Sequence, residues 1–178
     1  LIRAYAAYAS ILSALSLLFG LVVIPEVWIV SRLIGGFATG GLLVVIESWM
    51  LASSTASNRG RIMAIYMVLF YAAIVSGQLL LTRLSPGELT AFAVAAMAAS
   101  LSVVPLALSR VAMPQLDTSA KFNILSVLRK TPAATVSSAS AGLILGVIYG
   151  ILPLFFSQQG YDLDTTAKFM AATVSGGM

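Results

Sequence analysis

Apolar residues run along the chain in long stretches that short polar connections separate. A helix needs about 20 apolar residues to cross the roughly 30 Å hydrocarbon core of a bilayer. Five stretches have that length, at residues 4–24, 27–49, 62–82, 89–109 and 136–156, and a sixth begins near Thr166. The period-two alternation of a transmembrane barrel is absent. We therefore expect an all-α integral membrane protein with five complete transmembrane helices and the start of a sixth.

Composition supports this expectation and narrows the chemistry. Hydrophobic residues make up 60% of the chain and charged residues 9%, whereas soluble domains carry about 25% charged residues. The chain contains no Cys and no His, which removes disulfides, the usual zinc ligands and His-based catalysis. We expect no metal, no cofactor and no enzymatic activity. No basic run alternates with aromatic residues, so we expect no nucleic-acid partner.

The basic residues predict which ends of the helices are cytoplasmic, because Lys and Arg accumulate on that side of a membrane. One side carries Arg3, Arg59, Arg61, Arg110, Lys121, Arg129 and Lys130, and the other carries Arg83 and Lys168. The first helix therefore runs outward from the cytoplasm, and we place the protein in the cytoplasmic (inner) membrane of a bacterium.

The longest connection, residues 110–132, lies on the cytoplasmic side. Phe122, Leu125 and Leu128 share one helical face beside basic residues, which is typical of an amphipathic helix on the inner leaflet, although a solvated linker fits as well. This connection divides the chain into 1–110, a loop at 111–135, and 136–178.

Two charged residues interrupt the second hydrophobic stretch. Arg32 and Glu47 stand on one helix face but about 22 Å apart along the axis, so they cannot pair with each other. Arg32 either extends to the outer membrane surface or points into a polar interior. Glu47 lies near the cytoplasmic end, close in sequence to Asn58, Arg59, Gly60 and Arg61. It could form a structural or gating ion pair with Arg59, carry a coupling proton, or simply lie exposed at the interface.

Glycines recur every four residues in two of the stretches. Gly36 and Gly40 lie in the second, and Gly142, Gly146 and Gly150 lie in the fifth. Small residues at this spacing let membrane helices approach closely and also permit bending, so we expect these glycines to act in tight helix packing or as hinges. Pro153 removes a backbone donor near the outer end of the fifth helix. It could form either a gate or a static kink.

Polar side chains in the third and fifth helices are candidates for a solute path. Tyr71 and Gln78 are seven residues apart and therefore share one face. Gln78 lies near mid-bilayer, where it would either bridge helices or line a cavity. Tyr149 in the fifth helix is a further candidate.

The order of these features resembles the major facilitator superfamily. Arg32-x-x-x-Gly36-x-x-x-Gly40 is similar to that superfamily's helix 4 motif, and Glu47 followed by Arg59-Gly60-Arg61 is similar to its cytoplasmic charge network. Glu47-Ser48-Trp49 and Tyr149-Gly150-Ile151-Leu152-Pro153-Leu154 resemble a bacterial subgroup of largely uncharacterised, presumed efflux proteins. The resemblance covers essentially the whole chain, as helices 3 to 7 and the beginning of helix 8.

The resemblance implies a secondary active transporter that moves a small organic solute by alternating access, coupled to protons. Residues 1–110 would then belong to the N-terminal six-helix half and residues 136–178 would begin the C-terminal half. The partners would be the lipid bilayer, the solute, protons and the remainder of the protein's own chain, because we expect this sequence to be a fragment. The alternatives are a membrane scaffold that transports nothing, or an intramembrane enzyme whose chemistry lies elsewhere.

Overall fold

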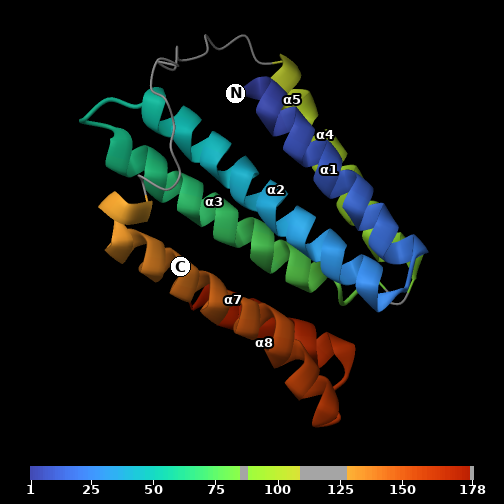
Figure 1. Ribbon diagram of the computed structural model, residues 1–178. Coiled ribbons are helices and arrows are strands. Elements are labelled where there is room, and N and C mark those ends of the chain that lie inside the picture. The colour runs from blue at the N-terminus through green and yellow to red at the C-terminus, as the bar shows by residue number, and fades with distance from the viewer. Residues whose placement is uncertain (85–87, 109–127, 177–178) are drawn as a thin grey trace.

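Helices account for all the regular secondary structure in the described part of the chain. The computed structural model describes residues 1–84, 88–108 and 128–176 (Figure 1). The helices in chain order are α1 (Ile2–Leu21), α2 (Pro25–Ala52), α3 (Arg59–Leu80), α4 (Leu89–Leu101), α5 (Val103–Leu108), α7 (Pro132–Gln158) and α8 (Leu163–Ser175).

Five helical segments are long and apolar enough to cross a membrane. They are Ile2–Leu21, Pro25–Ala52, Arg59–Leu80, Leu89–Leu108 and Pro132–Gln158. The expectation of an all-α protein with five spans is confirmed. α8, the expected sixth helix, begins at Leu163 rather than near Thr166. The predicted amphipathic helix falls largely on residues 109–127, outside the described residues.

The fourth span consists of two helices, α4 and α5, that meet at Ser102. Pro105 explains the break, because proline has no N–H to donate to the carbonyl four residues earlier, which belongs to Leu101. The Ser102 hydroxyl donates to the Ala99 carbonyl at 2.7 Å at this junction. In contrast, α7 continues through Pro153 to Gln158.

Helix α1 packs between α4 and α2, and these two pairs form the most extensive interhelical contacts. The Ser13 hydroxyl links α1 to α4 because it donates to the Ala96 carbonyl at 3.0 Å and lies 2.8 Å from the Ser100 hydroxyl. A Cβ added at Gly20 would lie 2.7 Å from a Leu89 methyl group, so the two backbones approach closely there. Such small-residue and hydroxyl contacts commonly join membrane helices.

The close approach of α1 and α2 occurs at Gly41, where an added Cβ would lie 2.4 Å from the Tyr8 ring. The glycines for which the sequence predicts close packing contact no other helix among the described residues. Added Cβ atoms at Gly36, Gly40, Gly142, Gly146 and Gly150 would all meet open space. On α2 the reason is the rotation of the helix about its axis. The side that faces α1 contains Gly41 and the buried residues Ser31 and Ala38, so the side that contains Gly36 and Gly40 is left uncovered.

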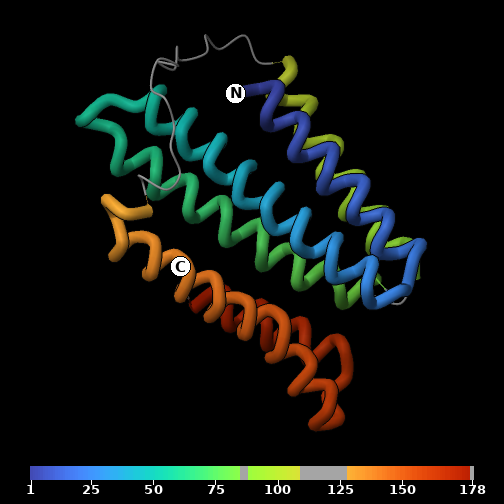
Figure 2. Tube along the Cα trace, viewed as in Figure 1, coloured from blue at the N-terminus to red at the C-terminus, as the bar shows by residue number. Residues whose placement is uncertain are grey.

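Helix α8 packs mainly onto α3 and less extensively onto α7 (Figure 2). Its buried face has helical spacing and consists of Thr166, Ala167, Met170, Ala171 and Val174. This contact joins the helices on either side of residues 109–127. α2 and α3, although consecutive in sequence, contact each other only sparsely.

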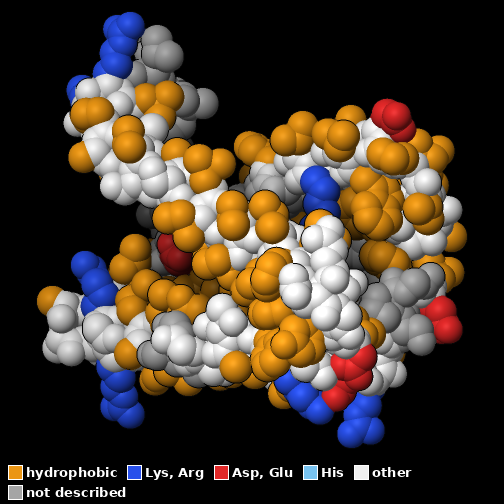
Figure 3. Space-filling view, turned by 90° about the horizontal axis from the view of Figure 1, so that it is seen from below, with side chains coloured by type: hydrophobic (Ala, Val, Ile, Leu, Met, Phe, Trp, Pro, Cys, Tyr) orange, Lys and Arg blue, Asp and Glu red, His pale blue; other side chains and the backbone are white. Residues whose placement is uncertain are grey.

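The surface is mostly apolar. In the most apolar part of each of the five spans, at most 11% of the residues are buried inside the molecule. Figure 3 shows hydrophobic side chains over much of one face, with charged side chains scattered among them. A surface of this kind is favourable against lipid and unfavourable against water.

Candidate functional site

The turn between α2 and α3 is closed by the polar residues that the sequence analysis grouped with Glu47. Asn58 accepts a hydrogen bond from the Thr55 backbone N–H at 2.7 Å, which folds the loop. Arg59 begins α3 and donates through Nε to the Ser54 hydroxyl at 3.3 Å. Gly60 faces open space, and the Arg61 side chain is exposed. Asn58 and Arg59 therefore hold this loop together.

Glu47 interacts with Tyr66 rather than with Arg59. Its carboxylate lies close enough to the Tyr66 hydroxyl to interact with it electrostatically. Glu47 lies five residues before the end of α2, and Tyr66 lies seven residues after the start of α3, so each is about 8–10 Å below the loop. Arg59, at the first position of α3, is nearer the loop than either. The structure forms no Glu47–Arg59 ion pair among its described residues.

Arg32 lies in the N-terminal half of α2, at the opposite end from Glu47. Its guanidinium carbon lies 5.0 Å from the centre of the Phe19 ring, which is cation–π distance. Phe19 in turn meets Trp28 edge to face at 5.5 Å, and the Trp28 indole donates to the Val22 carbonyl at 2.7 Å. The Arg32 side chain is exposed.

The other predicted path residues are not brought together. Tyr71 is half-buried on α3, with its ring 5.7 Å from that of Phe70, and Gln78 is half-buried two turns further along. Tyr149 lies exposed on α7. No contact joins α3 and α7 within the described ranges, so Tyr149 lies apart from the other two.

Three aromatic residues of this site were not predicted from the sequence. Tyr66 lies beside Glu47 and Phe19 lies beside Arg32, whereas Trp28 contacts Phe19 and supports its ring. A signal for Tyr66 was present in the sequence, because residues 47 and 66 are nearly equidistant from the turn of a helical hairpin. The Phe19 contact depends on how α1 and α2 rotate against each other, which hydrophobic periodicity does not specify.

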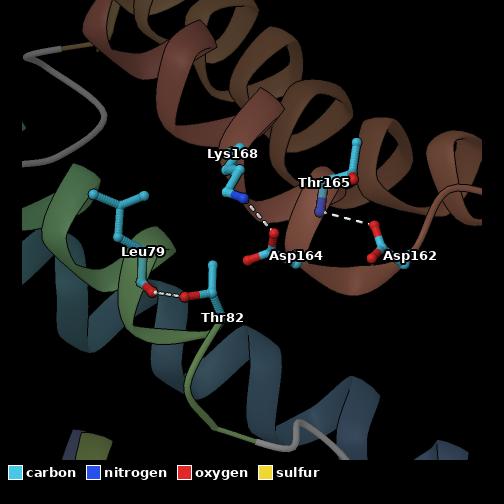
Figure 4. A network of polar contacts seen from close by, with 6 residues as sticks. All are labelled: Leu79, Thr82, Asp162, Asp164, Thr165 and Lys168. Atoms are coloured by element: carbon cyan, nitrogen blue, oxygen red, sulfur yellow. Dashed lines mark hydrogen bonds and ion pairs between the residues drawn. The ribbon is translucent and has the colours of Figure 1, made fainter.

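Acidic residues gather at the start of α8, near the end of α3 (Figure 4). Asp162 caps α8 by accepting a hydrogen bond from the Thr165 backbone N–H at 3.0 Å. Hydrogen bonding from Thr165 holds the pKa of Asp162 below its ordinary value, and the charge of Lys168 acts in the same direction. Asp164 pairs with Lys168 one turn later. Within residues 1–84, 88–108 and 128–176, no cluster of acidic side chains is arranged to hold a metal ion.

An apolar cavity of about 330 Å³ lies between the start of α1, the end of α2 and α5. Trp49 lines it, and the indole N–H of Trp49 is buried without a hydrogen-bond partner in the described structure. The remaining lining residues are Leu1, Ile2, Tyr5, Val45, Ile46, Met50, Ser102, Pro105 and Leu106.

Comparison with known proteins identifies relatives along nearly the whole chain. "Uncharacterized MFS-type transporter YcaD" of Escherichia fergusonii is 28% identical over 178 residues, which cover 99% of this chain and 47% of that protein. The protein of the same name from Escherichia coli O17:K52:H18 is 29% identical over 153 residues, which cover 85% of this chain and 40% of the relative. This chain is a homologue of MFS-type transporters. The resemblance to the major facilitator superfamily is confirmed.

This chain spans less than half the length of these curated relatives. No protein-family model matches it, and no solved structure matches it significantly. Both relatives are named as MFS-type transporters, and they come from bacteria.

Proposed function

We propose that this chain is part of a secondary active transporter that moves a small organic solute across the bacterial cytoplasmic membrane, coupled to protons. The observation that carries the proposal is homology to MFS-type transporters over 99% of the chain, together with five segments able to span a membrane. Efflux is the direction that the sequence resemblance favours.

The packing is compatible with alternating access, in which one group of helices rocks against another around a central site. Helices α1, α2 and α4 form one closely packed group, and α7 and α8 follow the 109–127 segment. The α3–α8 contact joins α3 to the second group, and α3 contacts the first group only sparsely, through α2. A buried face that includes the small residues Ala167 and Ala171 lets α8 pack closely on α3.

The proposed solute path contains Arg32, Tyr71, Gln78 and Tyr149. The first three carry polar groups at membrane depth, where an unneeded polar side chain is costly. Because Tyr149 lies apart from Tyr71 and Gln78, the proposal requires α7 to approach α3 at another stage of the cycle.

The proposed cytoplasmic gate contains Glu47, Asn58, Arg59, Gly60 and Arg61. In this arrangement Glu47 interacts with Tyr66, while Arg59 is hydrogen-bonded to Ser54 within the loop. Sparse packing between α2 and α3 leaves room for Glu47 to change partners as these helices move. We therefore place the Glu47–Arg59 ion pair in a second conformation.

The test is flux by the full-length protein in proteoliposomes of known orientation, with a panel of small organic solutes. A proton gradient should drive accumulation of at least one solute, and a protonophore should abolish it. Solute movement that ignores the gradient would remove the proton coupling. Absence of movement for every solute, by protein that remains monodisperse, would count against transport itself.

The same assay tests the gate. Glu47→Arg and Arg59→Glu should each reduce flux about tenfold or more, because charge-assisted pairs contribute roughly 1.5–3 kcal/mol. The double reversal should recover much of that loss. Additive losses in the double variant would show that the two residues act independently.

A further inference from the structure

The positive charge of Arg32 lacks a counter-charge in the described part of the chain. Arg32 stands seven residues after the start of α2, about 10 Å along the helix from Pro25. Its guanidinium has five N–H donors, and none of them donates to a group in residues 1–84, 88–108 or 128–176. Glu26, the acidic residue closest in sequence, lies about 120° away around the helix axis.

The Arg32 side chain is nevertheless held in place. Phe19 of α1 contacts the guanidinium at 5.0 Å, and Trp28 of α2 supports the Phe19 ring edge to face. The Trp28 indole is fixed by its hydrogen bond to the Val22 carbonyl at the end of α1. Contacts from both helices therefore keep the cation beside an aromatic wall and reduce the entropy lost when an anion binds.

The surroundings select the kind of anion. Guanidinium groups bind carboxylates and phosphates bidentately, which ammonium groups cannot do. Ile29 and Leu33, which flank Arg32 on α2, are both exposed and apolar, and Phe19 adds a ring face. The Gly36 face one turn away is open to an added Cβ, so no described side chain blocks access from that direction.

We infer that Arg32 and Phe19 form a binding site for an organic oxyanion, which is a carboxylate or phosphate attached to an apolar body. Two sources can present this chemistry: a transported solute, or the phosphate of a lipid headgroup in the outer leaflet. If the solute is the source, the inference rests on the proposed function and specifies its substrate class as anionic.

The experiment measures ligand-induced thermal stabilisation of the full-length protein in phosphatidylcholine nanodiscs. The probes are benzoate, naphthoate and phenyl phosphate, with benzamide as the neutral isostere of benzoate. Anions should stabilise the wild type more than benzamide does, and Arg32→Gln should weaken their binding about tenfold or more. Arg32→Lys should retain part of the effect, and Phe19→Leu should lose part of it.

Arg83→Gln is the matched control, because it removes a positive charge on the same side of the membrane and should leave anion binding unchanged. A second arm adds phosphatidylglycerol to the nanodiscs and counts retained lipid by native mass spectrometry. Loss of retained phosphatidylglycerol in Arg32→Gln, without a change for the soluble anions, would assign the site to lipid. No difference between Arg32→Gln and wild type in either arm, or an equal loss in Arg83→Gln, would overturn the inference.

These readouts need no transport, so the two proposals can fail separately. If anion binding depends on Arg32 but the protein shows no flux, the anion site stands and the proposed transport function fails. If the protein shows gradient-driven flux but Arg32→Gln binds anions as the wild type does, the transport function stands and the anion site fails.

Discussion

Individual charges in this apolar chain lie beside groups that fix their positions. Arg32 contacts Phe19, and Glu47 interacts with Tyr66. Both partners are aromatic, and both come from the neighbouring helix of a hairpin. An aromatic side chain can lie in hydrocarbon and still offer a ring face or a hydroxyl to a charge, whereas a second charged residue would carry its own cost of burial.

Asp162 allows a test of stability against pH. Its pKa is lowered by hydrogen bonds from Thr165, so its contribution to stability is fully present above its ordinary value of 3.8. That contribution is lost as the pH falls through the lower pKa of the folded state. Asp162→Ala should therefore lower the thermal unfolding midpoint of the full-length protein at pH 6, and the difference from wild type should shrink below pH 3.8.

Unfolding scans of both proteins between pH 6 and pH 2.5 provide the measurement. Asp164→Ala, at the second residue of the same helix, controls for simple loss of negative charge. A difference that stays constant across the whole range would show that the ionised Asp162 carboxylate does not stabilise α8.

At the scale of helices, small residues make the closest contacts. The direction in which each glycine faces matters more than how many glycines a helix contains. Gly20 faces α4 and Gly41 faces α1, whereas Gly36 and Gly40 face neither. A four-residue interval indicates a smooth helix face, but it does not say whether a neighbour covers that face.

Gly41→Ala and Gly36→Ala form a matched pair on α2. The alanine Cβ at position 41 would lie 2.4 Å from the Tyr8 ring, so the ring must move. We expect a loss of about 1–3 kcal/mol in the free energy of unfolding from this overpacking. At position 36 an added Cβ meets no atom within 4 Å, and the variant should be unchanged or up to about 1 kcal/mol more stable.

Denaturant titration of the full-length protein in detergent measures both variants. An equal loss at position 36 would mean that another segment of the full-length protein packs against that face. A harmless Gly41→Ala would contradict the close α1–α2 packing.

At the scale of the whole molecule, α8 is the helix with the largest set of buried residues, and it uses them to contact α3. The contact brings together segments about 100 positions apart in the chain, as the midpoints of Arg59–Leu80 and Leu163–Ser175 indicate. We therefore expect α3 and α8 to move together as one unit.

Ala167→Leu should disrupt that interface, because Ala167 is 3% exposed and has no space for a larger side chain. Overpacking of this kind costs about 1–3 kcal/mol, so we expect reduced flux and a lower unfolding midpoint. Ala172→Leu makes the same change on the exposed face of α8 and should preserve both properties. Equal effects of the two substitutions would show that the α3–α8 interface has no special role.

The sequence by itself determined the fold class and the number of spans. Long apolar stretches can satisfy their backbone in a bilayer only as helices, so their length and count predict the five spans directly. Proline and polar residues also predict where several helices begin, as Pro25 does for α2. The order of Arg32, Glu47 and Arg59-Gly60-Arg61 was enough to indicate the transporter family that the relatives then confirmed.

Only the tertiary structure decided which residues meet. Helix rotation places Gly41 rather than Gly36 against α1, and depth along the α2–α3 hairpin brings Tyr66 rather than Arg59 to Glu47. Both properties depend on side-chain packing between helices. In an almost uniformly apolar chain, hydrophobic periodicity gives little information about rotation, because lipid-facing and helix-facing positions have the same chemistry.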